Sequence, residues 1–156
     1  MQKELVICII IVIAIIIGNV ITHNNTKSAV AEVNRSLQEV SSRISENNKE
    51  TSSKKTASEG NIKKEEGNIE KNSDDENIKK IEEAIVNSKE IWDKKYQTLA
   101  YYIEHDELEK VSEAIVKAKS NISAEEYNTA IENIDSCIFL LQHIEEKDKF
   151  SLKNIF

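Results

Sequence analysis

The sequence predicts an all-α protein: an N-terminal transmembrane helix, a flexible linker and a small antiparallel bundle of three helices. Three observations predict it. Residues 5–21 are apolar apart from Asn19. The 156-residue chain contains no proline and only three glycines, a composition that favours long helices over short strands. Apolar residues recur at spacings of three and four through most of the remainder, which is the period of a helix buried on one face.

The run from Leu5 to Ile21 predicts a membrane anchor in residues 1–22. Its seventeen residues would extend about 26 Å as a helix, close to the ~30 Å hydrocarbon core of a bilayer. A cleaved signal peptide is the alternative, but it needs small residues just beyond the run, and residues 19–23 offer none. A short head before the run and a long domain after it predict a single-pass cell-membrane protein with its N-terminus inside and its C-terminal domain outside.

Residues 27–46 predict an amphipathic stalk helix. Two interpretations of it stand, because two heptads are fewer than a secure coiled coil needs. The stalk either self-associates or packs on the C-terminal domain as the fourth helix of the bundle. Its apolar positions follow a heptad pattern and are Val30, Val33, Leu37, Val40 and Ile44.

Residues 47–73 predict a low-complexity polar linker. Residues 47–55 carry no apolar side chain, so they cannot bury enough surface to offset the entropy of ordering. Three near-copies of a short unit follow, around Ile62, Ile69 and Ile78. Three such short units do not make a solenoid, and we expect a flexible tether.

Residues 74–156 predict an acidic bundle of three helices joined by short turns. The sequence Ser123-Ala124-Glu125-Glu126 has the residue types of a capping box and predicts that the third helix begins with Ser123 as its N-cap. The predicted core stripes are Ile78, Ile81, Ile85, Trp92, Leu99 and Ile103 in the first helix, Leu108, Val111, Ile115, Ala118 and Ile122 in the second, and Tyr127, Ala130, Ile131, Ile134, Cys137, Ile138, Leu141 and Ile144 in the third.

The formal charge is unevenly placed. Residues 1–73 carry a net charge of +1 and residues 74–156 a net charge of −8. An acidic C-terminal domain argues against nucleic acid as a partner and against docking on an anionic lipid surface. We interpret the acidic surface as a solvated face.

No pattern in the sequence predicts catalysis, a metal site or a cofactor. The run Glu104-His105-Asp106-Glu107 gathers metal-ligand types, but adjacent residues on a helix do not share a face. His143 and Glu146 can share one, but a single pair does not complete a metal site. Cys137 lies on a core stripe, where a buried and inert thiol is expected. We therefore expect a protein that is not an enzyme and has no metal or cofactor.

Aromatic and apolar residues near two helix ends are the candidate partner-binding residues. Two adjacent tyrosines cannot both face one core, and the C-terminal segment stays apolar to its last residue, which is unusual for a terminus that does not dock. We expect that segment to fold back across the helices or to insert into a partner. The candidates are Tyr101, Tyr102, Phe150, Leu152, Ile155 and Phe156.

The C-terminal run from Leu140 to Phe156, together with Trp92 and the turn Ile103-Glu104-His105-Asp106-Glu107-Leu108, resembles the domain-of-unknown-function family numbered 4363. That family contains small membrane-anchored helical proteins of Gram-positive anaerobes that end in a Leu-Ser-Leu-x-Asn-Ile-Phe pattern. The resemblance covers the anchor and about residues 76–156, and the segment 45–73 departs from it. It implies a membrane location and a helical shape, but no known activity.

These observations predict a membrane-anchored extracytoplasmic protein that serves as a non-enzymatic protein-interaction module or as an accessory subunit of a membrane complex. Its partner would be another membrane protein or a second copy of the chain. The alternative function is an extracytoplasmic helical bundle that senses a ligand or an ion.

Overall fold

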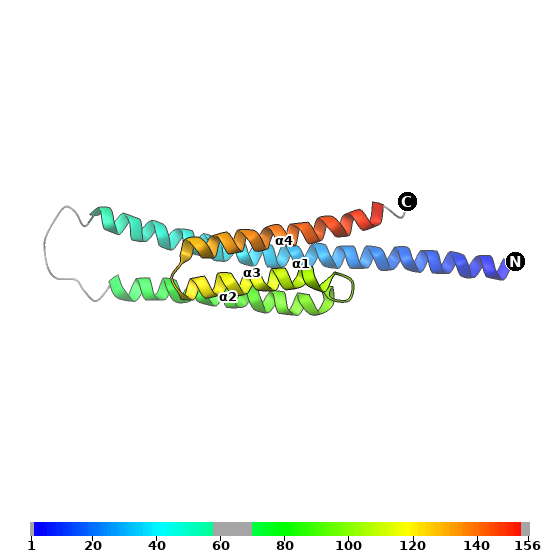
Figure 1. Cartoon of the computed structure of the whole chain (residues 1–156), viewed down its shortest axis with the longest axis horizontal. Helices are drawn as coiled ribbons and strands as arrows, with labels where there is room; N and C mark the ends of the chain where they lie inside the picture. Colours follow the sequence, from blue (N-terminus) through cyan, green and yellow to red (C-terminus); the bar gives the residue numbers. More distant parts are fainter. Residues whose placement is uncertain (1, 58–69, 154–156) are drawn as a thin grey trace.

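The computed structural model describes residues 2–57 and 70–153, and all of its regular elements are α-helices. Successive helices run antiparallel, and each packs on its neighbours in the cyclic order α1, α2, α3, α4 (Figure 1). Within the described ranges, the backbones of the helices on opposite corners of the bundle, α1 with α3 and α2 with α4, stay more than 8 Å apart between Cα atoms. The all-α prediction is confirmed, and the bundle has four helices. They are α1 (Gln2–Ala57), α2 (Glu70–Leu99), α3 (His105–Ser123) and α4 (Tyr127–Lys153).

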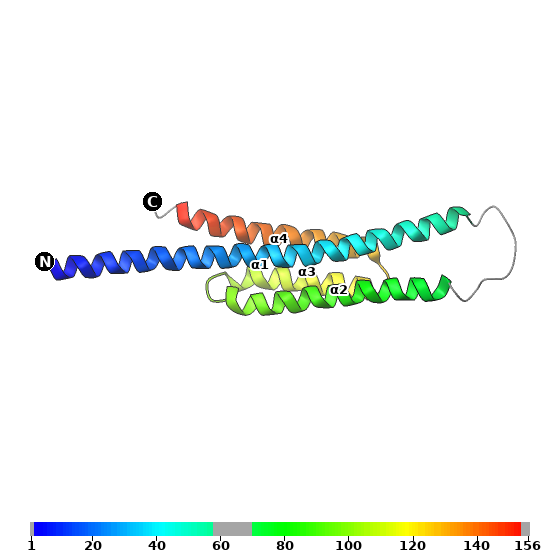
Figure 2. The ribbon, with the colours of Figure 1, turned by 180° about the vertical axis from the view of Figure 1, so that it is seen from behind.

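α1 is a single helix of 56 residues that extends well beyond the rest of the bundle. Its N-terminal part projects alone, and its later turns lie alongside α2 and α4 (Figures 1 and 2). Every residue of the heptad stripe from Val30 to Ile44 is at most 1% exposed, in one core with α2, α3 and α4. The predicted stalk helix is therefore the fourth helix of the bundle.

Helices extend into both ends of the segment predicted as a linker. α1 continues to Ala57 and α2 begins at Glu70, while residues 58–69 lie outside the described residues. The burial pattern of α1 explains part of this extension. Asn47 follows Ile44 by three residues, on the same helix face, and is only 9% exposed. The bundle therefore covers α1 beyond its last apolar core residue.

Two polar pairs lie between helices inside the core. The Ser36 and Ser88 hydroxyls hydrogen-bond at 2.6 Å between α1 and α2. The Trp92 indole Nε1 donates to Ser112 Oγ at 2.7 Å between α2 and α3, and the indole packs edge-on against Tyr96. Since buried polar groups need partners, these pairs favour one register of the helices over its neighbours.

The prediction that Ser123 begins the third helix is wrong. Ser123 is the last residue of α3, and α4 starts at Tyr127. The intervening residues close α3 instead: Glu125 N–H donates to Ile122 O at 3.0 Å and Glu126 N–H donates to Asn121 O at 2.8 Å. This pattern is a Schellman motif, and its left-handed position is held by Glu125, with φ of 58°.

We predict that Leu37→Ala destabilises the bundle by about 3 kcal/mol, because it empties a fully buried position. The measurement is thermal unfolding of the full chain in detergent, followed by far-ultraviolet circular dichroism. Ile16→Ala is the matched control on the same helix, since Ile16 is 38% exposed. Equal stability of Leu37→Ala and the unaltered chain would contradict the placement of this stripe in the core.

We predict that Glu125→Gly stabilises the chain by about 0.5–1 kcal/mol, because glycine adopts the left-handed conformation without the steric cost that other residues carry. Ser123→Gly, on the same turn but in a helical position, should instead destabilise. Denaturant unfolding of both variants measures the difference. A loss of stability in Glu125→Gly would show that the turn does not require the left-handed backbone.

Candidate functional site

The N-terminal half of α1 exposes apolar side chains on every face. The large apolar residues between Leu5 and Ile21 are 38–62% exposed. Mean hydropathy reaches 3.1 over an 18-residue window, and none of that window is buried. A helix that is apolar all round needs an apolar environment. By length and composition, this is the one helix in the described part of the chain that can span a membrane.

The end of the bundle next to this span is a second distinctive region, which we call the base. It comprises residues 22–26 of α1, the loop 100–104 between α2 and α3, and the last turns of α4. His23 Nδ1 lies 3.0 Å from Asp148 Oδ2. Residues 22–26, the part of the base that α1 supplies, come directly after the apolar run. The base therefore starts where the span ends.

Tyr102 and Lys147 fix the loop of the base. The Tyr102 hydroxyl accepts from Asn25 Nδ2 at 3.3 Å and lies 3.4 Å from Thr26 Oγ1. Lys147 Nζ lies 2.7 Å from Glu107 Oε1 and 3.2 Å from Glu104 Oε1. Its bonds to these two carboxylates raise the pKa of Lys147. The loop is therefore attached to both α1 and α4.

The predicted partner-binding residues that the structure describes lie at the base. Tyr101 is 89% exposed, whereas Tyr102 is half-buried and bonded to α1. The backbone of α4 carries Phe150 and Leu152 toward the same end of the bundle (Figure 1). The side chains of these two residues, and all of Ile155 and Phe156, lie outside the described residues.

Sequence reasoning missed the residues that hold the base together. His23, Asn25, Thr26 and Asp148 were not predicted, although the polar run that begins at Thr22 directly after the span was visible in the sequence. It also missed Phe139, which is 68% exposed on α4. Phe139 lies two residues from both Cys137 and Leu141 of the core stripe, and this spacing on a helix indicates an outward position.

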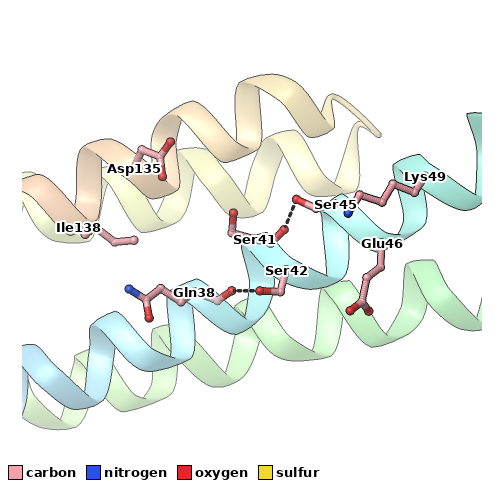
Figure 3. A pocket seen from close by; sticks show the side chains of 8 residues that line it. All are labelled: Gln38, Ser41, Ser42, Ser45, Glu46, Lys49, Asp135 and Ile138. Atoms are coloured by element: carbon pink, nitrogen blue, oxygen red, sulfur yellow. Dashed lines mark hydrogen bonds between the residues drawn. The ribbon is translucent and has the colours of Figure 1, made fainter.

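A polar groove of about 680 Å³ runs between α1 and α4 (Figure 3). Two of its hydroxyls already donate to the backbone of α1: Ser42 Oγ to Gln38 O and Ser45 Oγ to Ser41 O, both at 2.9 Å. The groove is lined by residues with hydroxyl, amide, carboxylate and ammonium groups and by one apolar side chain. These residues are Gln38, Ser41, Ser42, Ser45, Glu46, Lys49, Asp135 and Ile138.

The residues considered for metal binding or reactivity are separated. His105 is the first residue of α3 and His143 is on α4, and both are exposed. In the described ranges, no group of three or more His, Cys, Asp or Glu side chains is placed to hold a metal ion. Burial raises the pKa of the Cys137 thiol to about 12, and its Sγ lies 3.9 Å from Val111 O.

Comparison with known proteins identifies a family. The family described as Domain of unknown function (DUF4363) matches residues 51–155. We expected the resemblance to include the anchor and to depart over 45–73, but the match starts at residue 51 and leaves the anchor out. Comparisons with curated proteins and with solved structures return no match. On this match, which covers all of α2, α3 and α4, the chain belongs to the DUF4363 family.

Proposed function

We propose that this protein is a single-pass membrane protein whose four-helix bundle lies outside the cell membrane and acts as a non-enzymatic interaction module or accessory subunit of a membrane complex. One observation carries the proposal: α1 supplies both the apolar span and one of the four helices of the core. The bundle is thereby held beside the bilayer without an intervening linker. A partner spanning the same membrane would meet α1 in the lipid and the sides of the bundle above it.

The use of polar side chains supports a binding role rather than a catalytic one. The buried contact of Ser36 with Ser88 and the partly buried contact of Trp92 with Ser112 connect helices. His23 pairs with Asp148 between α1 and α4. Groups engaged in this way stabilise the arrangement of helices.

The proposed orientation predicts a labelling pattern in intact cells. A membrane-impermeant maleimide should label Ser120→Cys, because Ser120 is exposed on α3. The unaltered chain should stay unlabelled, since Cys8 lies in the apolar run and Cys137 is buried with its pKa raised to about 12. At pH 8 only about one Cys137 thiol in 10⁴ would be the reactive thiolate. Lys3→Cys should react only in permeabilised cells, and the reverse pattern would place the bundle inside.

Photo-crosslinking in native membranes tests the interaction. A photoreactive phenylalanine analogue is introduced separately at Val86, Val116 and Phe139, three exposed apolar positions on α2, α3 and α4. An accessory subunit should give one recurrent protein adduct from one face only, identified by mass spectrometry. The two positions that give no adduct are the matched controls, because they are also exposed apolar residues but lie on other helices of the bundle. Adducts of equal yield from all faces would contradict a specific interface.

The groove between α1 and α4 favours a second candidate, a bundle that senses a small ligand or an ion. Six of its eight lining residues belong to α1, the helix that continues into the span, so occupancy would act directly on the anchored helix. If crosslinking recovers only the chain itself, the sensing function is favoured over the interaction with another protein. It then requires a shift in melting temperature with a polar ligand or a divalent cation that Asp135→Asn reduces.

A further inference from the structure

We propose that the base of the bundle is itself a lipid-contacting surface: the Tyr101 loop and the end of α4 enter the headgroup layer of the bilayer that α1 spans. This inference rests on the membrane anchoring in the proposed function. It assigns lipid, rather than another protein, as the partner of the candidate binding residues at this end. Three observations support it: the height of the base relative to the apolar run, the residue types at the base and the rigidity of α1.

The height of the loop follows from its bonds to α1. Asn25 and Thr26 lie four and five residues beyond Ile21, the last residue of the apolar run. At 1.5 Å per residue they lie about 6–7.5 Å above the hydrocarbon. The headgroup layer on each side of the ~30 Å core is about 5–8 Å thick. Because Tyr102 bonds to both residues, the loop sits at the outer edge of this layer, and the neighbouring Tyr101 is 89% exposed there.

The end of α4 comes closer still. Asp148 pairs with His23, which lies two residues beyond the apolar run. α4 then continues toward the membrane as far as Lys153 (Figures 1 and 2). His23 lies about 3 Å above Ile21, and the five residues after Asp148 add about 7.5 Å toward the membrane. The backbone of α4 therefore reaches the level of Ile21 near Phe150 and ends about 4.5 Å beyond it.

The residue types at the base are those found at membrane interfaces. The sequence after Asp148 is Lys-Phe-Ser-Leu-Lys, and the loop presents Tyr101. Aromatic side chains are enriched at both membrane–water interfaces, and lysines there place their stems in the lipid and their ammonium groups in water. Lys147 neutralises part of the acidic charge of the base by pairing with Glu104 and Glu107. The remaining acidic residues favour a zwitterionic surface over an anionic one.

The height of the base is set by a rigid connection. α1 passes from the span into the bundle as one uninterrupted helix, without proline and with its last glycine, Gly18, inside the apolar run. A helix bends sharply only where such a break exists. The bundle therefore stands at a defined distance from the lipid.

Fluorescence quenching by brominated lipid tests the inference on the full chain. The chain is reconstituted into vesicles of phosphatidylcholine brominated near the carbonyl ends of its acyl chains. Tyr101→Trp and Phe150→Trp should each lose most of the added emission relative to unbrominated vesicles. Phe139→Trp is the matched control, an exposed aromatic position eleven residues before Phe150 on α4, or about 16 Å farther from the membrane. It should keep its emission, as should the native Trp92, which is 1% exposed.

A further variant, Val6→Trp, separates failure of this inference from failure of the membrane anchor, because Val6 lies at the far end of the apolar run, level with the brominated positions of the other leaflet. Strong quenching of Val6→Trp with undiminished emission from Tyr101→Trp would overturn lipid contact at the base and leave the anchor intact. Unquenched Val6→Trp would overturn the anchor as well. Equal quenching of Phe139→Trp and Tyr101→Trp would show a bundle lying on its side, which also contradicts contact through the base. Tyr101 makes little packing contact, so its substitution leaves the core unchanged.

Discussion

The continuity of α1 is the constraint on which the rest of the structure depends. One helix combines two patterns: it is apolar on every face up to Ile21, then apolar along a single stripe from Val30 onward. Its backbone hydrogen bonds are made within the helix, which lipid requires. In the bundle, the same bonds leave the backbone of α1 with no need for partners from the other helices. Because α2 and α4 both pack on α1, their directions and heights are fixed relative to the span, and α3 then completes the square.

Packing of apolar stripes alone would leave the register of four similar helices weakly determined, because a shift by one heptad replaces one apolar residue with another. Polar pairs in and around the core remove this degeneracy. A shift of α2 against α1 would separate the Ser36 and Ser88 hydroxyls, and a shift against α3 would separate Trp92 from Ser112. The Ser88 and Ser112 hydroxyls would keep their bonds to the backbone of their own helices, but the Ser36 hydroxyl and the Trp92 indole would lose these partners. Leaving a buried group unpaired costs more than the bond contributes when formed. Register matters here because it also decides which residues reach the base.

Elements with strong local signals could be predicted from the sequence. The apolar run predicted an exposed apolar helix long enough to span a membrane. The stripes at three-and-four spacing predicted the core: Leu37, Trp92, Ile115 and Leu141 are each at most 1% exposed. The turn before α4 could not be predicted, because Ser123-Ala124-Glu125-Glu126 suits a helix start by composition while the structure uses it to end α3. The contacts of the base could not be predicted either, for another reason. His23 meets Asp148 across 125 residues of chain, and Asn25 meets Tyr102 across 77, and no local pattern encodes such pairings.

The adjacency of α1 and α4 has a consequence for the order of assembly. The first helix to be synthesised packs on the last one, so part of the apolar stripe of α1 stays uncovered until Tyr127–Lys153 has been made. The hairpin of α3 and α4 involves neighbours in the chain and can form early, whereas closing the ring around α1 brings distant segments together and is slower. A growing chain with an uncovered stripe is prone to pair with its own copies. If α1 spans a bilayer as we propose, those encounters are restricted to the membrane plane while the remaining helices are synthesised.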